Sequence, residues 1–194
     1  MDDLSDDDLI LMYREGDADA FDTLFVRHAT GVYSFARTML TDAGGAEEIL
    51  QETFLSVART AARYTPRGRF RSWLMRIVRN RCLNRLDAQR RRRAMLGAGA
   101  VVAEPASAEP SPARQAEANE QRALIRAAVA DLPDRQREAI ALYALEEMTY
   151  REIAAVLDMP INTVKTLIHR ARASLARALE SPSQEPTREL RRDV

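Results

Sequence analysis

The chain is poor in the residues that metal and disulfide sites need. Its 194 residues include one cysteine and two histidines, which excludes a disulfide framework and a Cys/His zinc site. It also lacks a Gly-rich phosphate loop, and no arrangement typical of a catalytic triad or carboxylate dyad is present. We therefore expect no enzyme activity, no catalytic residues, no cofactor and no bound metal.

Long apolar runs and alternating patterns are absent as well. No uncharged stretch approaches the length of a membrane span, and the N-terminus is acidic, unlike that of a signal peptide. No segment alternates apolar and polar residues as a half-buried strand does. We therefore expect an all-α protein that is located in the cytoplasm and does not insert into a membrane.

Positive charge is concentrated in one segment, although the formal net charge of the chain is zero. Eleven arginines and a single acid, Asp87, lie between Arg67 and Arg93, whereas the 66 residues before this segment carry 13 acids and five bases. Within the segment, apolar residues recur every three or four positions, which predicts an amphipathic helix. A folded helix of this charge is typical of a phosphate-binding surface, and this interpretation is favoured over a merely solvated basic face. The apolar stripe consists of Phe70, Trp73, Leu74, Ile77, Val78, Cys82 and Leu86.

Capping and breaking residues divide the first 95 residues into four helices. Residues 5–8 have the form of a capping box, and Asp17 is expected to cap a second helix that runs to about Leu40. A third helix should begin after residues 42–45, and residues 65–68 should break the chain before the basic helix. The buried face of the second helix is expected to include Leu24, Phe25 and Phe35.

A second helical region follows a linker. Residues 96–118 are rich in Ala, Pro, Gly and Ser and are predicted to be flexible, as are residues 181–194, which carry mixed charge and two prolines. Between them, a helix that holds Leu124, Ile125, Ala128 and Val129 is expected to end at residues 132–133. Further on, Thr149 should cap a short helix, and a tight turn should lead to a basic last helix beginning at Asn162 or Thr163. This is the outline of a helix-turn-helix, with a helical hairpin that has a solvated basic face as the alternative.

Two blocks of sequence, one on each side of the linker, carry a family resemblance. The first comprises residues 46–55 (AEEILQETFL) and 70–80 (FRSWLMRIVRN), and the second comprises residues 150–154 (YREIA) and 162–172 (NTVKTLIHRAR). The chain resembles the extracytoplasmic-function (ECF) subfamily of bacterial sigma-70-type RNA polymerase sigma factors. The resemblance implies two small helical domains, an N-terminal bundle and a C-terminal helix-turn-helix domain: sigma region 2 at 1–95, a linker at 96–118, sigma region 4 at 119–180 and a tail at 181–194.

The resemblance also implies three functional surfaces. The third helix would bind the clamp of the polymerase largest subunit through Glu48, Gln51 and Glu52. The basic helix would read the −10 element through the outward-facing Arg76, Arg79, Asn80 and Asn84. The last helix would enter the −35 major groove with Thr163, Lys165, Thr166, Arg170 and Arg172. Leu167 stands where family members usually carry arginine, so one −35 contact is expected to be missing.

The resemblance thus predicts a subunit that directs core RNA polymerase to promoters and initiates transcription through −10 and −35 recognition. Its partners would be the clamp and flap regions of the polymerase, promoter DNA and an anti-sigma factor. Because the linker leaves the two domains loosely tethered, we expect weak binding to free DNA. A stand-alone helix-turn-helix regulator, or an RNA-binding adaptor that uses the arginine-rich helix, would be the alternative.

Overall fold

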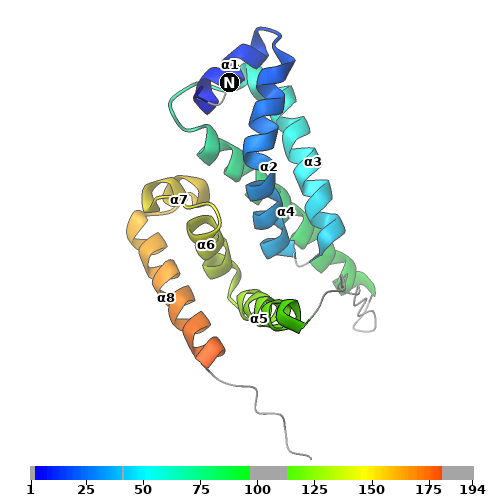
Figure 1. Ribbon diagram of the computed structural model, residues 1–194, viewed down its shortest axis with the longest axis vertical. Helices are drawn as coiled ribbons and strands as arrows, with labels where there is room; N and C mark the ends of the chain where they lie inside the picture. The colour runs from blue at the N-terminus through cyan, green and yellow to red at the C-terminus, as the bar shows by residue number, and fades with distance from the viewer. Residues whose placement is uncertain (1–2, 41, 97–112, 181–194) are drawn as a thin grey trace, which may run out of the picture.

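The computed structural model describes residues 3–40, 42–96 and 113–180, and every regular element in these ranges is helical (Figure 1). The all-α prediction is thereby confirmed. Within the described ranges, no helix combines the length and apolar character that crossing a membrane requires. In chain order the elements are α1 (Asp6–Arg14), α2 (Ala18–Leu40), α3 (Ala43–Thr60), the 3-10 helix η1 (Ala61–Arg63), α4 (Phe70–Leu96), α5 (Ala113–Ala130), α6 (Asp134–Ala144), α7 (Tyr150–Leu157) and α8 (Ile161–Glu180).

The first unit is a bundle of α1 to α4 in which α2 packs against the other three helices. The expected capping box forms at α1, where Ser5 accepts a hydrogen bond from the Asp8 N–H and the Asp8 carboxylate accepts one from the Ser5 N–H. Asp7 accepts hydrogen bonds from the Tyr64 hydroxyl and the Gly68 N–H, both at 2.6 Å. These two bonds fix the loop that leads into α4.

The second unit contains α5 to α8. Thr149 and Glu152 form a reciprocal capping box at the start of α7, as predicted from Thr149. Asp158 follows α7 in the left-handed conformation with φ of 53°, and Pro160 then leads directly into α8. This tight turn fixes the angle between the two helices of the helix-turn-helix. Helix α8 begins at Ile161, directly after Pro160 and before the predicted start at Asn162 or Thr163.

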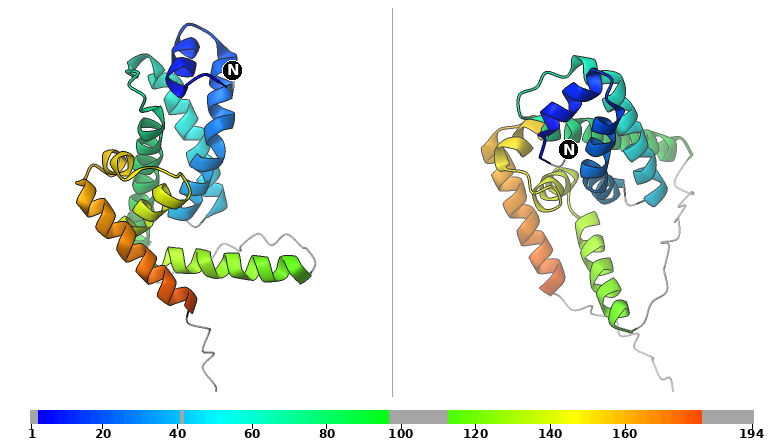
Figure 2. Two further views of the ribbon diagram at one scale, coloured as in Figure 1. Left: turned by 60° about the vertical axis from the view of Figure 1, so that its left-hand side comes forward. Right: turned by 45° about the horizontal axis from the view of Figure 1, so that its top comes forward.

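The two units pack against each other in the structure. Helix α4 lies against α7, and α2 lies against α6 and α5, as Figure 2 shows from two further directions. One apolar core therefore runs through both units. This contact differs from the loose tethering that the sequence suggests, and the reason is the second buried face of α4 described below.

Several predicted boundaries and core positions differ from the structure. Helix α5 begins at Ala113, so the predicted linker extends too far, and residues 97–112 and 181–194 lie outside the described residues. Helix α3 begins at Ala43 because Asp42 caps it through the Gly45 N–H at 2.7 Å. Phe25, which was assigned to the buried face of the second helix, is instead exposed, and Leu124 and Ile125 of α5 are exposed as well.

Candidate functional site

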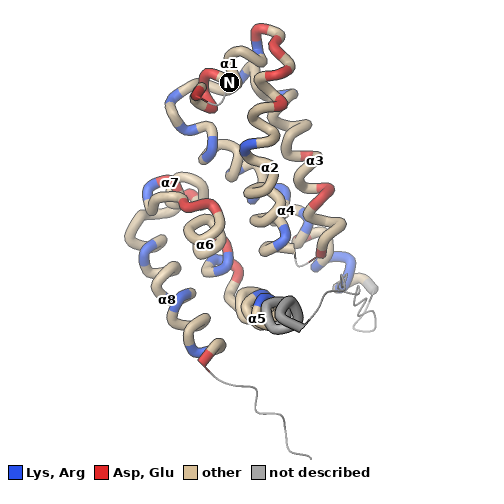
Figure 3. The backbone as a smooth tube through the Cα atoms, in the orientation of Figure 1, with Lys and Arg blue, Asp and Glu red and all other residues tan. Residues whose placement is uncertain are grey.

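An acidic face follows the outer side of α3 (Figure 3). The side chains of Glu47, Glu48, Gln51 and Glu52 are exposed on it, while Ile49, Thr53 and Phe54 point into the bundle. Leu55 is also exposed and continues the same face. The structure thus brings together the three residues predicted to bind polymerase and adds an apolar residue beside them.

Two arginines of α4 pair with this acidic face. Arg81 donates to Glu52 at 2.6 Å, and Arg85 donates to Glu48 and also lies 3.9 Å from Asp42. The hydrogen bond that Arg85 donates to Glu48 raises the pKa of Arg85, and burial opposes this only in part. Sequence analysis missed both arginines because their partners lie 29 and 37 residues earlier in the chain.

The predicted −10 residues of α4 do not share one environment. Arg76, Asn80 and Asn84 are exposed at successive turns of the helix and form one stripe. Arg79 was expected to point outward with them, but it is only 8% exposed and pairs with Glu138 of α6 at 2.8 Å. The outward assignment of Arg79 is therefore wrong in this arrangement.

Arg79 is buried because α4 has a second buried face. Ser72, Met75 and Arg79 follow one another at helical spacing on this face, which lies beside the stripe assigned from the sequence. Met75, an apolar residue outside the predicted stripe, was the available signal. Its 1% exposure shows that α4 packs on two sides.

Four arginines of α4 connect the first unit to the second. Besides the Arg79–Glu138 pair, Arg71 lies 3.4 Å from Glu146, Arg90 lies 2.6 Å from Asp134, and Arg76 donates to the backbone carbonyl of Ala155. Much of the positive charge that the sequence assigned to DNA therefore faces carboxylates and a carbonyl of the second unit.

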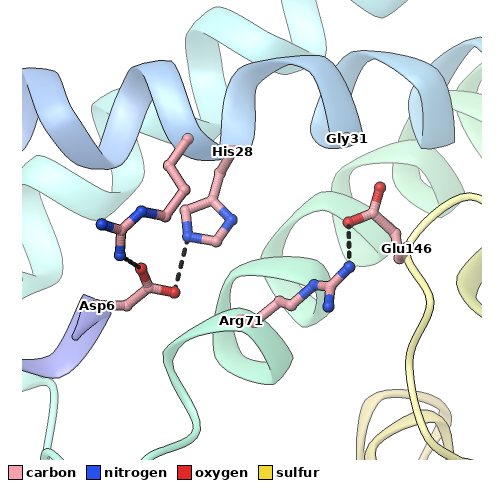
Figure 4. A pocket seen from close by; sticks show the side chains of 6 residues that line it. Asp6, His28, Gly31, Arg71 and Glu146 are labelled. Atoms are coloured by element: carbon pink, nitrogen blue, oxygen red, sulfur yellow. Dashed lines mark hydrogen bonds and ion pairs between the residues drawn. The ribbon is translucent and has the colours of Figure 1, made fainter. Parts of the chain in front are cut away.

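An open hollow of about 440 Å³ lies at the junction of the two units (Figure 4). Arg71 and Glu146 approach it from α4 and from the connection between α6 and α7, and His28 and Gly31 approach it from α2. Burial raises the pKa of the Glu146 carboxyl, and the charges of Arg71 and His28 oppose this only in part. A Cβ atom at Gly31 would clash with the Glu146 carboxyl, so a larger residue there would force the Glu146 side chain to move.

The other charged groups of the hollow form a separate network. Asp6 accepts from Arg27 at 2.6 Å and lies 2.8 Å from His28 Nε2. Burial raises the pKa of Asp6, but the hydrogen bonds and charges of His28 and Arg27 outweigh it and lower the pKa below its ordinary value. Among the described residues, no cluster of His, Cys, Asp and Glu could hold a metal ion.

Helix α8 presents a polar face away from the core. Val164, Ile168 and Ala171 are buried, which leaves the predicted −35 residues Thr163, Lys165, Thr166, Arg170 and Arg172 exposed. Within the described residues, Lys165 and Arg170 make no ion pair or hydrogen bond through their side chains, so both remain available to an external ligand.

Two positions of α8 have specific environments. The guanidinium of Arg172 lies over the ring of Tyr143, 4.6 Å from its centroid, and the Tyr143 ring stacks on that of Tyr150. Leu167 is half-buried and packs against the core, so this position of α8 contributes to folding.

Comparison with known families gives matches on both units. The family model for sigma-70 region 2 matches residues 24–92, and that for sigma-70 region 4 matches residues 122–175. The chain is 36% identical over 167 residues to the RNA polymerase sigma factor CarQ of Myxococcus xanthus, covering 86% of this chain and 93% of that protein. The chain belongs to the sigma-70-type RNA polymerase sigma factors.

Further relatives agree with this membership. The ECF RNA polymerase sigma-E factor of Escherichia coli (strain K12) is 31% identical over 178 residues, covering 89% of this sigma factor and 93% of the relative. The solved structure of CnrH in complex with the cytosolic domain of CnrY has a TM-score of 0.70 at 28% identity and covers 92% of this chain and 99% of CnrH.

A second solved structure supports the fold alone. The sigma factor RpoE in complex with the anti-sigma factor NepR, from Bartonella quintana, has a TM-score of 0.67 at 22% identity, covering 84% of this chain and 98% of that one.

As an RNA polymerase sigma factor, the protein directs core polymerase to promoters and takes part in initiation through −10 and −35 recognition. Family membership decides against the stand-alone regulator and the RNA-binding adaptor.

Proposed function

We propose that three surfaces of this sigma factor divide promoter recognition among them. The acidic face of α3, with Glu48, Gln51 and Glu52, binds the clamp of the polymerase largest subunit. Its exposed carboxylates and Leu55 suit a basic partner with an apolar centre. The flap region of polymerase would contact the second unit, where α5 and α8 expose Leu124, Ile125 and Leu179.

Helix α4 reads the −10 strand in this proposal. Asn80 and Asn84 each offer a donor and an acceptor to an unstacked base, and Arg76 and Arg79 supply positive charge for the backbone. Because Glu138 holds Arg79 beneath the second unit, Arg79 reaches DNA only after the units separate. We therefore propose that the packed arrangement is a closed state that polymerase binding opens.

Helix α8 enters the −35 major groove. Lys165, Thr166 and Arg170 would lie nearest the bases, with Thr163 and Arg172 nearer the phosphates. The exposed polar face of α8, directly after the tight turn at Asp158, supports this assignment most directly. The assignment also predicts that Arg172 must leave Tyr143 or contact DNA from its position over the ring.

Three further points complete the proposal. The protein acts by binding and not by catalysis, so strand separation draws on the capture of unstacked bases. It acts in the cytoplasm, where polymerase and promoter DNA are found. An anti-sigma factor is a further partner, supported by the family and by the complex of CnrH with the cytosolic domain of CnrY.

Run-off transcription with purified core polymerase and a pool of genomic promoter fragments tests these assignments. The wild-type protein should initiate from a discrete subset of fragments, whereas Glu48→Ala/Gln51→Ala/Glu52→Ala should lose both initiation and core binding. Lys165→Ala/Arg170→Ala should keep core binding and lose initiation. Asp131→Ala/Glu180→Ala, which removes two exposed acids elsewhere, is the matched control and should behave as wild type. Full core binding by the α3 variant would refute the proposed polymerase face.

A further inference from the structure

The acidic face of α3 and the DNA-reading side of α4 are connected through two arginines. Arg81 and Arg85 lie one turn apart on α4 and pair with Glu52 and Glu48. Each arginine directly follows one of the asparagines assigned to the −10 strand, Asn80 and Asn84. The arginine pair and the asparagine pair therefore lie on stripes of α4 that are about 100° apart around the helix.

These ion pairs are well placed to exchange partners. The carboxylates are 55% and 61% exposed and the arginines 30% exposed, so water and an approaching protein reach them from outside. The Nε atoms of both arginines are buried and have no hydrogen-bond partner among the described residues. Each guanidinium hydrogen-bonds its carboxylate through Nη1 alone, which leaves the other terminal NH group for a second acceptor, and exposed pairs of this kind are held only weakly.

We propose that Arg81 and Arg85 are shared between the polymerase-binding face and promoter DNA. In the free protein they neutralise Glu52 and Glu48. When a basic surface of polymerase takes over these carboxylates, both arginines are released to the phosphates of the −10 strand beside Asn80 and Asn84. This inference rests on the proposed role of the acidic face, and it makes polymerase binding a direct condition for full DNA binding by α4.

The exchange has a reciprocal consequence. If polymerase binding frees the arginines for DNA, then DNA binding must strengthen polymerase binding by the same factor. From the usual strength of exposed pairs, two of them give a coupling of about two- to thirtyfold. Loss of both arginines should therefore have opposite effects on the two partners.

Arg81→Gln/Arg85→Gln in the full chain separates this proposal from a purely structural role. Its affinity for core polymerase, measured by anisotropy of the labelled protein, should rise about two- to thirtyfold because Glu48 and Glu52 are no longer neutralised. The matched control is Arg91→Gln/Arg93→Gln, which removes two exposed charges from the same helix, and it should leave core affinity near the wild-type value. A core affinity that falls or stays unchanged in Arg81→Gln/Arg85→Gln would overturn the proposal.

A second measurement examines the DNA side. We expect the holoenzyme formed with Arg81→Gln/Arg85→Gln to bind a labelled single-stranded oligodeoxynucleotide of mixed sequence less tightly. The slope of log affinity against log salt concentration should be shallower by about 1.4, the value for two lost phosphate contacts on a single strand. An unchanged slope would overturn the proposal even if core affinity rises.

Glu48→Gln/Glu52→Gln distinguishes failure of this inference from failure of the proposed polymerase face. If this variant keeps full core affinity, the acidic face itself has been misassigned. If it loses core affinity while the arginine variant keeps wild-type DNA binding, the face stands and only the exchange is wrong. Thermal unfolding of each variant shows whether the fold is retained.

Discussion

At the residue scale, Glu146 shows how closely the two helical units fit. Its carboxyl lies against the backbone of Gly31 on α2 and 3.4 Å from Arg71 on α4, and it is almost fully buried. Its Oε1 atom has no hydrogen-bond partner among the described residues. A charged carboxylate in this position is costly, which is why burial raises its pKa.

The raised pKa of Glu146 predicts a pH dependence of the packed arrangement. The neutral carboxyl is favoured in the packed state. Its contribution to the free energy of unfolding is therefore complete below the ordinary pKa of 4.5 and is lost as the pH rises through the raised pKa. We expect Glu146→Gln to abolish this part of the pH dependence of stability from pH 4.5 upward. Denaturant unfolding over a pH series measures this dependence. Equal slopes of the free energy of unfolding against pH for the wild type and Glu146→Gln would contradict the assignment.

The residue after Glu146 is strained. Glu147 has a φ of 46°, a left-handed conformation that costs roughly 1 kcal/mol for a residue with a Cβ. We expect Glu147→Gly to raise the free energy of unfolding by about 0.5–1 kcal/mol, reduced by the greater freedom of glycine in the unfolded chain. Glu147→Ala keeps the Cβ and should give no such gain. Equal unfolding midpoints for the two variants would show that the strain is relieved elsewhere.

At the element scale, α4 serves more surfaces than its sequence revealed. The stripe of Phe70, Leu74, Val78 and Cys82 was predictable because apolar residues at helical spacing mark a buried face. The second face was not evident, because Met75 is its single apolar member beside Ser72 and Arg79, and arginine is rarely buried without a partner. Glu138 supplies that partner from 59 residues away in the chain, a distance over which spacing carries no information.

Local signals, in contrast, placed the helix-turn-helix correctly. Thr149 and Glu152 satisfy each other's backbone groups at the start of α7, so Thr149→Ala should destabilise the protein by about 1 kcal/mol. Amide hydrogen exchange should accelerate in α7 and in the adjoining turn. Ser5→Ala removes the equivalent box from α1 and should leave exchange in α7 unchanged. Faster exchange in α7 for both variants would indicate that the effect is not local.

At the scale of the whole molecule, the main difference from the sequence-based view is the contact between the units. Composition and repeated helical patterns predicted both units and their helices, and family resemblance predicted their order. The packing of α4 on α7 and of α2 on α6 depends on the buried Arg79–Glu138 pair and on the fit of Glu146 against Gly31. Neither the ion pair nor the Glu146–Gly31 contact is visible as a local pattern in the sequence. As a result, the exposure of Arg76, Asn80 and Asn84 was predictable, and the burial of Arg79 was not.

Breaking the Arg79–Glu138 pair from one side should open the molecule. Glu138→Gln leaves the Arg79 charge buried without a counter-charge, at a cost of about 3–5 kcal/mol that separation of the units avoids. We expect a larger radius of gyration in small-angle scattering, whereas Arg79→Met/Glu138→Leu should remain compact. Asp134→Asn, which loses the exposed pair with Arg90 and the partly buried pair with Arg137 but no buried pair between the units, is the control and should scatter as wild type. An unchanged radius for Glu138→Gln would show that this pair does not hold the units together.

The closed arrangement of the free sigma factor and its opening on polymerase are tested most directly by one distance. Ala62→Cys and Ala173→Cys place dyes on exposed sites of the two units, and the native Cys82 does not compete because burial raises its thiol pKa to about 12. Energy transfer between the dyes should be lower with core polymerase bound than in the free protein. Equal transfer in the free and bound states would contradict the account, because Arg79 would then remain beneath the second unit while the promoter is read.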